Sequence, residues 1–180
     1  ILRMIAGLEH PDSGDIIIDG KVVNDIPASK RGIGFVFQNY ALFRYMTVYD
    51  NIAFGLRVQK VSKKKIDERV KELIKLIGLE GLDNRFPSQL SGGQKQLMNL
   101  ASVMAMSPDV IILDEPTSQL DPITANDFIT TLKKINDELG LTVIIIEHRL
   151  QEVFPIADKV AVMEDGKVIC YDTPRNVCEK

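Results

Sequence analysis

Apolar residues recur along the chain with two different periods, and each period indicates one kind of element. Residues 1–8 place apolar side chains at helical spacing, and Gly7 and Pro11 stand where such a helix should end. A second helix is predicted to start after Ser62, its N-cap, and to end before Gly78. Its apolar stripe comprises Ile66, Val70, Leu73, Ile74 and Ile77. The Lys and Arg residues between them are expected to form a solvated face.

Short runs of consecutive apolar residues predict strands. One short strand is expected within residues 14–20, and fully buried strands within residues 32–38, 109–115 and 141–148. Residues 159–172 predict a hairpin that turns on its Asp-Gly pair.

Helices are predicted between these strands. One starts at Asp121, with Pro122 at its first position and Gly140 after its end. Its buried face is expected to comprise Phe128, Leu132, Ile135 and Leu139. A short helix is expected at residues 150–157, and residues 41–106 are expected to be largely helical.

The alternation of buried strands and helices predicts an α/β fold. Continuous apolar strands indicate a mostly parallel sheet covered on both faces. The helical stretch at residues 41–106 is then an insertion between two strands of that sheet. We therefore expect a single domain over residues 1–180, with a core of residues 1–40 and 107–180 and a helical subdomain of residues 41–106.

Composition and charge narrow the class of protein. The chain has 180 residues, 45% hydrophobic and 26% charged, which is ordinary for one globular domain. Its net charge of −3 argues against a nucleic-acid partner. The two cysteines, Cys170 and Cys178, have neither a metal-site nor a disulfide spacing and are expected to be reduced thiols. No apolar run approaches the ~18 residues of a membrane-spanning helix.

Two adjacent carboxylates follow the buried strand at residues 109–115. Asp114 suits Mg²⁺ and Glu115 suits a general base, because neighbouring side chains on a strand point opposite ways. The strand end is also where open α/β sheets bind ligands. The alternative is a pair of solvent-facing acids at a strand end.

Three further stretches carry candidate chemistry. The sequence "LSGGQ" combines a helix cap, Ser91, with two glycines that let backbone amides approach an anion, or it is an ordinary capped helix. His148 follows a buried strand and could hydrogen-bond a phosphate oxygen, or it is a structural histidine. Gln38 ends another strand and could ligate Mg²⁺ through its carbonyl oxygen, or simply cap the strand.

Taken in order, these stretches resemble the nucleotide-binding domain of ABC (ATP-binding cassette) transporters over the whole chain. The sequence "FVFQ" is similar to the Q-loop of that family, "LSGGQ" to its signature, and "VIILDE" to its Asp-Glu strand. "SQLD" and "EH" are similar to its D-loop and H-loop. The resemblance implies a P-loop NTPase (RecA-like) fold.

The resemblance also implies a segment ahead of Ile1. In this family the helix that starts like residues 1–8 directly follows the P-loop, G-x-x-x-x-G-K-[ST], and that pattern occurs nowhere in the chain. We therefore expect an N-terminally truncated domain that lacks its P-loop and first strands. The residues that precede Ile1 in the parent sequence would test this expectation most directly. The first half resembles sulfate/thiosulfate importer ATPases, and the second half resembles energy-coupling-factor importer ATPases for vitamins and metal ions.

The family mechanism assigns a role to each candidate residue. Two cassettes pair head to tail around two ATP molecules, and catalysis is mainly positioning and charge stabilisation. Glu115 would polarise the attacking water, Asp114 and Gln38 would organise Mg²⁺, and His148 would sense the γ-phosphate. The signature, comprising Ser91, Gly92, Gly93 and Gln94, would contact ATP held by the other subunit, and Asp121 would link the two sites.

The resemblance implies partners and a location as well. A second cassette and transmembrane permease subunits are expected, the latter docking near Gln38 and residues 39–51. The chain would lie in the cytoplasm, at the inner face of the membrane. Two other classes stay open: a catalytically inactive fragment, recombinant or design that keeps only the fold, and a soluble ABC ATPase outside transport.

Overall fold

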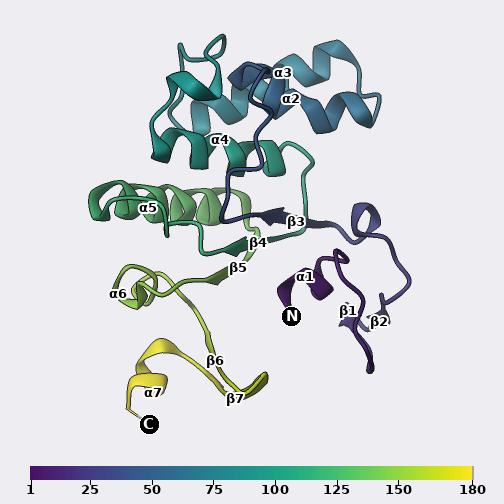
Figure 1. Cartoon of the computed structure of the whole chain (residues 1–180), viewed down its shortest axis with the longest axis vertical. Helices are drawn as coiled ribbons and strands as arrows, with labels where there is room; N and C mark the ends of the chain where they lie inside the picture. The colour runs from purple at the N-terminus through teal and green to yellow at the C-terminus, as the bar shows by residue number, and fades with distance from the viewer. Residues whose placement is uncertain (180) are drawn as a thin grey trace. The chain divides into compact units, whose positions relative to one another are not determined.

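The structure, a computed structural model, describes residues 1–179 and divides into two compact units, Ile1–Ile146 and Glu147–Lys180 (Figure 1). The helices of the first unit are α1 (Leu2–Ile5), α2 (Val48–Val58), α3 (Lys63–Leu76), α4 (Gly92–Met104) and α5 (Pro122–Leu139). Its strands are β1 (Ile17–Ile18), β2 (Lys21–Val22), β3 (Ile33–Val36), β4 (Val110–Asp114) and β5 (Thr142–Ile146). The second unit contains α6 (Leu150–Val153), β6 (Val160–Glu164), β7 (Lys167–Asp172) and α7 (Pro174–Cys178).

The first unit is built on a parallel sheet in the order β3-β4-β5. Ile112 at the middle of β4 lies between Phe35 of β3 and Ile144 of β5. The central position of β4 explains why Ile111, Ile112 and Leu113 are fully buried. The mixed α/β architecture with a parallel sheet agrees with the prediction, and it brings the ends of β3, β4 and β5 to one edge.

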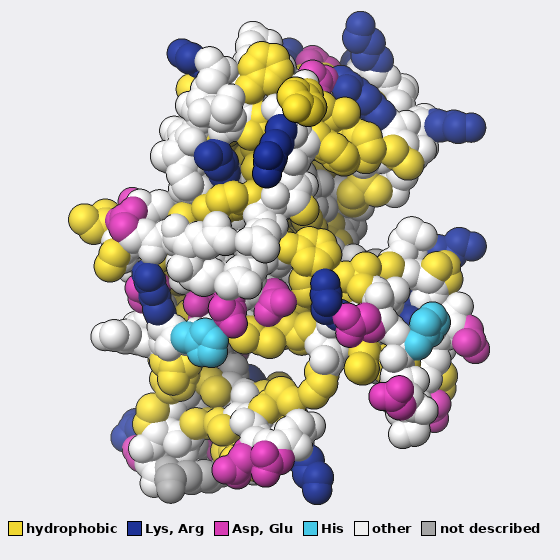
Figure 2. All heavy atoms as spheres, viewed as in Figure 1, with side chains coloured by type: hydrophobic (Ala, Val, Ile, Leu, Met, Phe, Trp, Pro, Cys, Tyr) yellow, Lys and Arg dark blue, Asp and Glu magenta, His cyan; other side chains and the backbone are white. Residues whose placement is uncertain are grey.

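Helices α4 and α5 lie along one side of this sheet, and α2 and α3 lie beyond α4 (Figure 1). The predicted apolar stripe of α3 is buried at every position, which confirms that face. The lysines at its start, Lys63, Lys64 and Lys65, are exposed, as expected for a solvated face. Figure 2 shows Lys and Arg side chains projecting from this helical region.

A close approach joins the sheet to α4. A Cβ atom on Gly34 in β3 would lie 2.2 Å from Cγ1 of Val103 in α4 and 3.2 Å from Cγ of Pro108. Only a glycine leaves room for this contact. The residue type at position 34 therefore sets how tightly α4 packs on β3.

The first predicted helix is shorter than its apolar spacing suggested. Helix α1 ends before Gly7, whose φ is +79°, and Ile1 and Leu8 are exposed. Its end is held by Arg31, which donates Nη1 to the carbonyl oxygens of Met4 and Ile5 at 2.8 and 2.9 Å. Arg31 thus satisfies carbonyl groups at the C-terminus of α1, although it lies 27 and 26 residues further along the chain than the residues it bonds.

Three other elements differ from the prediction at their ends. The strand expected within residues 14–20 is a two-residue strand paired with β2 in a small hairpin. The helix expected at residues 150–157 is only α6. Leu139, predicted to be buried, is 39% exposed because it is the last residue of α5.

Strand β5 is not fully buried, contrary to the prediction. Thr142, Ile144 and Ile146 are exposed, and the residues between them are half-buried. The reason is position: β5 pairs only with β4, so it is an edge strand of the sheet in the described part of the chain. A long apolar run in sequence does not distinguish an edge strand from a central one.

The second unit contains the predicted hairpin. Strands β6 and β7 pair antiparallel and turn at Asp165 and Gly166, with φ values of +47° and +76°. Two consecutive residues in the left-handed region fit a type I′ turn, for which Asp-Gly is favoured. Among residues 1–179 the helices are all too short or too polar to cross a membrane.

Candidate functional site

The side chain of Gln38 meets two residues far along the chain, just beyond the end of β4. Its Nε2 donates to Oε2 of Glu115 and to Oγ of Ser118, each at 3.2 Å. Ser118 donates its hydroxyl to the main-chain oxygen of Glu115 at 2.9 Å. The fold thus brings Gln38 and Glu115, both predicted site residues, together at the carboxyl edge of the sheet, where α/β sheets bind ligands.

Glu115 reaches this position through an unusual backbone conformation. Its φ is +45°, a region that residues other than glycine rarely adopt. Strand β4 ends at Asp114, and the N–H of Glu115 donates to the carbonyl oxygen of Ile146 at 3.0 Å. The alternation of side chains along a strand, which predicts opposite directions for Asp114 and Glu115, therefore does not extend to Glu115. The turn directs its carboxylate toward Gln38.

Asp114 is half-buried at the last position of β4. No group of three or more His, Cys, Asp or Glu side chains within residues 1–179 could hold a metal ion. Mg²⁺ that arrives with a nucleotide needs only one or two protein oxygens, because phosphates and waters supply the rest. The carboxylate of Asp114 and the side-chain carbonyl of Gln38 are oxygen donors of the kind that such an ion takes.

The first turn of α4 is held by a reciprocal capping box. Oγ of Ser91 accepts from the N–H of Gln94 at 3.3 Å, and Oε1 of Gln94 accepts from the N–H of Ser91 at 2.9 Å. The N–H groups of Gly92 and Gly93 have no acceptor in the described part of the chain. Free amides at a helix N-terminus favour anions.

Asp121 caps α5 with both carboxylate oxygens. Oδ1 accepts from the N–H groups of Ile123 and Thr124, both at 3.1 Å, and Oδ2 accepts from the hydroxyl of Thr124 at 2.6 Å. The Thr124 hydroxyl is the main cause that lowers the pKa of the Asp121 carboxyl below its ordinary value, and the two backbone amides lower it further. In this chain the side chain therefore holds the start of a helix.

His148 is exposed and lies in the second unit, between β5 and α6 along the chain. Its role toward a phosphate stays a prediction.

Several residues near the predicted site lie in stretches that the sequence analysis identified, but received no individual role from the sequence. Ser118 bonds both Gln38 and Glu115, and Gln119 Nε2 donates to Oδ1 of Asn39 at 2.8 Å. Tyr40 places its hydroxyl against the first turn of α4, and burial raises the pKa of this group. The sequence signal that could have identified these residues is that polar residues directly follow two apolar strands. Their convergence requires β3 and β4 to be parallel neighbours, which composition does not reveal.

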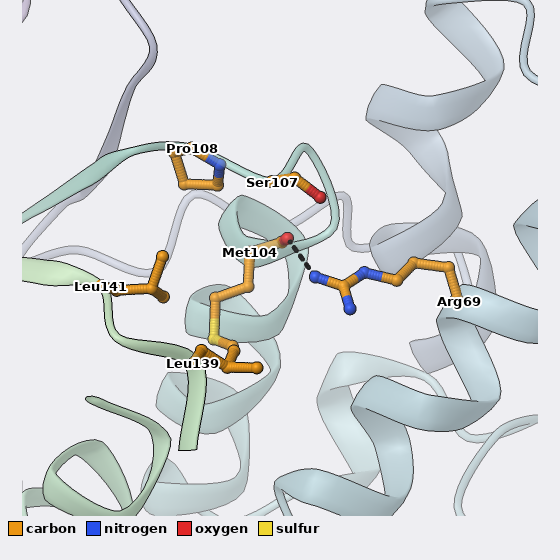
Figure 3. A pocket seen from close by; sticks show the side chains of 6 residues that line it. All are labelled: Arg69, Met104, Ser107, Pro108, Leu139 and Leu141. Atoms are coloured by element: carbon orange, nitrogen blue, oxygen red, sulfur yellow. Dashed lines mark hydrogen bonds between the residues drawn. The ribbon is translucent and has the colours of Figure 1, made fainter. Parts of the chain in front are cut away.

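The hollows of the first unit include one of about 280 Å³, which is lined by Arg69, Met104, Ser107, Pro108, Leu139 and Leu141 (Figure 3). Nη2 of Arg69 donates to the carbonyl oxygen of Met104 at 3.1 Å, so its guanidinium serves the C-terminus of α4. None of the predicted site residues lines this hollow, and it is not the candidate site.

A smaller hollow, of about 170 Å³, lies beside the segment that follows Gln38. Its walls include Phe35, Phe37, Phe43 and Phe54, whose rings pair at centroid distances of 4.6 Å and 4.4 Å. Phe43 and Phe54 are 45% and 37% exposed. Exposed aromatic side chains around a hollow are typical of a protein-binding surface.

Comparisons with known proteins identify relatives of this chain. The sequence profile described as "ABC transporter" matches residues 1–118. The sulfate/thiosulfate import ATP-binding protein CysA 2 of Agrobacterium fabrum is 46% identical over 182 residues, covering 100% of this chain and 53% of that protein. The CysA protein of Synechocystis sp. is 47% identical over 179 residues, covering 99% of this chain and 50% of that protein. The chain spans about half the length of these curated relatives.

A solved structure gives the same answer for the fold. The structure of cbiO1 from Clostridium perfringens, described as part of the ABC transporter complex cbiONQ, superposes with a TM-score of 0.88. It is 34% identical and covers 99% of this chain and 73% of that chain. This match confirms the predicted fold class, a P-loop NTPase type of parallel sheet flanked by helices.

Proposed function

Since the chain belongs to the ABC transporter ATPase family, we propose that it is the ATP-binding and ATP-hydrolysing subunit of an ABC importer, where it couples hydrolysis to solute uptake. The observation that carries this proposal is the convergence of Gln38, Glu115 and Ser118 just beyond β4. A carboxylate and an amide held together at a sheet edge can orient one water molecule beside a phosphate.

In this proposal Glu115 is the general base. A water molecule attacks the γ-phosphorus, its proton passes to the Glu115 carboxylate, and ADP leaves with the bond between the β- and γ-phosphates broken. Gln38 donates to the same carboxylate at 3.2 Å and so fixes its direction. Bound Mg²⁺ would neutralise charge on the phosphates, and Asp114 and the Gln38 carbonyl oxygen would hold it.

The N-terminus of α4 would serve a nucleotide held by a second cassette. Ser91, Gly92, Gly93 and Gln94 form a capped turn with free amides, which suits a γ-phosphate. Asp121 would link the two nucleotide sites of the pair, and His148 would hydrogen-bond the γ-phosphate of its own site. These assignments follow the family mechanism, residue by residue.

Permease subunits would dock on the aromatic hollow formed by Phe35, Phe37, Phe43 and Phe54. The segment that leaves Gln38 runs along this hollow, so a partner seated there would act directly on the position of Gln38. The chain would then work in the cytoplasm, held at the membrane by its permease. The names of the curated relatives favour sulfate or thiosulfate as the solute.

A mixing experiment tests the proposal. A cassette with an intact P-loop, but with the serine of its own signature replaced, is assayed for ATP hydrolysis with and without this chain. We expect stimulation by this chain, because its Ser91 turn can complete the site of the other subunit.

Two variants serve as matched controls. Ser91→Arg places a bulky side chain at the phosphate and should abolish the stimulation, whereas Ser13→Arg in an exposed loop should leave it intact. Circular dichroism first confirms that each variant is folded. A folded chain that gives no stimulation, at concentrations where intact cassettes pair, would contradict the proposal.

A further inference from the structure

The two glycines at the start of α4 lie against residues that follow β3 and β4 along the chain. A Cβ atom on Gly93 would stand 2.3 Å from Cγ2 of Thr124, a separation that real Cβ atoms essentially never show. A Cβ atom on Gly92 would stand 3.3 Å from the hydroxyl of Tyr40 and 3.4 Å from Cδ2 of Leu120. The methyl group of Thr124 is thus the tightest of these contacts and touches the backbone of α4 itself.

The direction of that methyl group is fixed by Asp121. Thr124 donates its hydroxyl to Oδ2 of Asp121 at 2.6 Å, while Oδ1 of the same carboxylate accepts two backbone amides at 3.1 Å. The hydroxyl and the methyl group share one Cβ atom, so fixing one fixes the other. The carboxylate therefore holds the side chain of Thr124 in the rotamer that presses on Gly93.

The part of α4 that receives this contact is the part with free donors. The capping box occupies the amides of Ser91 and Gln94, and the amides of Gly92 and Gly93 have no acceptor within residues 1–179. The direction of free amides depends on where the first turn stands. A contact on Gly93 therefore sets where these two amides point.

We infer that Thr124 is a positioning residue for the first turn of α4: held by Asp121, its methyl group acts as a wedge that orients the amides of Gly92 and Gly93. The inference rests on the proposed function only in taking a phosphate as the group that these amides meet. It connects the cap of α5 to the signature turn of the same chain, so movement at Asp121 changes the direction of those amides.

Hydrogen exchange in the 180-residue chain tests the contact without any nucleotide. Thr124→Ser keeps the hydroxyl bond to Asp121 but removes the methyl group. We expect the amides of Gln94 and Lys95 to exchange about tenfold faster, since local opening governs their exchange. Thr130→Ser, the same change at an exposed position of α5, should leave them unchanged. Equal exchange in wild type and Thr124→Ser would overturn the inference.

A double substitution gives a sharper test, because the contact predicts a reversal of sign. Gly93→Ala alone should speed exchange in the first turn of α4, since its Cβ atom meets the Thr124 methyl group. Adding Thr124→Ser opens room for that Cβ atom and should slow the exchange again. If Thr124→Ser speeds exchange both in the wild-type chain and in the Gly93→Ala variant, the Thr124 methyl group does not act as a wedge and the inference is wrong.

The mixing assay supplies a readout that simple packing would not move. With Thr124→Ser, we expect the kcat of the stimulated cassette to fall about tenfold at an unchanged KM for ATP, because positioning acts in the transition state. Thr130→Ser should give the wild-type kcat. Equal kcat values for Thr124→Ser and wild type would overturn the inference. Failure of the wild-type chain to stimulate would instead contradict the proposed function, and the exchange measurements would still decide the role of Thr124.

Discussion

Glu115 carries the chemistry in the proposed mechanism, and its partners allow a clean substitution. In a cassette where this sequence follows a P-loop, Glu115→Gln should lower the turnover of ATP by about 10²–10⁴, the usual contribution of a general base. ATP binding should persist, because the amide oxygen of the new Gln can still accept from Nε2 of Gln38. Single-turnover kinetics and a binding titration measure the two effects separately.

Asp114→Asn is the natural counterpart at the neighbouring position. It removes a charge from the proposed Mg²⁺ site, so it should weaken Mg²⁺-dependent binding of ATP more than Glu115→Gln does. Near-normal hydrolysis in Glu115→Gln would remove this residue from the role of base.

The pKa of Asp121 gives a second test at the scale of one residue. The Thr124 hydroxyl is the main cause of its lowered pKa, so Thr124→Val should raise that pKa toward the ordinary value of about 3.9. A carboxyl whose pKa is lowered by folding stabilises the folded state above its unfolded pKa, and that stabilisation is lost as the pH falls through the folded value. An NMR titration of the Asp121 carboxyl in both proteins measures the shift. An unchanged pKa would show that the hydroxyl bond does not form in solution.

The sequence predicted Asp114, Glu115 and Gln38 because each directly follows a run of apolar strand residues. It placed Ser118 only within the D-loop stretch and gave no role to Thr124, because the importance of both depends on neighbours that are remote in sequence. Ser118 matters because β3 and β4 are adjacent, and Thr124 matters because α4 and α5 touch at Gly93. Such contacts between elements leave no periodic signal in either element alone.

Glycine positions show how closely the elements pack. Gly34→Ala in β3 would bring a Cβ atom to 2.2 Å from Cγ1 of the β-branched Val103, so we expect it to lower the free energy of unfolding by about 1–3 kcal/mol. Gly55→Ala in α2 would meet Sδ of Met106 at 2.4 Å, but that atom belongs to a flexible side chain and can move. Because alanine also favours helix over glycine, Gly55→Ala should be near neutral or stabilising.

Urea unfolding of both variants measures this contrast. Val103→Ala provides the check, since it removes the clashing methyl group and should recover part of the loss in Gly34→Ala. Equal loss of stability in Gly34→Ala and Gly55→Ala would mean that side-chain flexibility does not decide the outcome.

Elements with long, regular patterns were predictable, and element ends were not. The apolar stripe of α3, the Asp121 cap and Gly140 stop of α5, and the Asp-Gly turn of the hairpin all appear as expected. Helix α1 was overestimated because local spacing cannot show that Arg31 would take over its C-terminus. The local sequence pattern therefore indicates whether a segment is a helix or a strand, whereas tertiary contacts determine the residue at which it ends.

The edge position of β5 has a consequence for the chain as a whole. Its exposed residues include Ile144 and Ile146, 37% and 40% exposed, on a strand that pairs only with β4 within residues 1–179. Apolar strand edges promote association between chains, and a lysine on such an edge opposes it. We therefore expect Ile144→Lys to lower the concentration-dependent association of the 180-residue chain in analytical ultracentrifugation. Thr142→Lys, which replaces a polar residue on the same strand, should have a smaller effect. Equal association in Ile144→Lys and wild type would show that the chains associate through a surface other than the edge of β5.

At the scale of the whole molecule the sequence indicated the α/β class correctly, and the structure adds a division into two compact units. The boundary falls between Ile146 and Glu147, inside the run "VIIIEH" that looks continuous in sequence. A run of apolar residues does not show where one compact unit of the chain ends and the next begins. The structure describes His148 in the second unit, and its grouping with Glu115 stays a prediction.

The left-handed backbone of Glu115 also bears on how such a protein evolves. That conformation costs a residue with a Cβ atom about 1 kcal/mol relative to glycine. Glu115→Gly and Glu115→Ala both remove the carboxylate, so the glycine variant should be the more stable of the two by about that amount in thermal unfolding. Equal stabilities would mean that the backbone relaxes without cost. Under the proposed mechanism, a lineage freed from hydrolysing ATP would gain stability by drifting to glycine at this position, so the left-handed glutamate would persist only while turnover is selected.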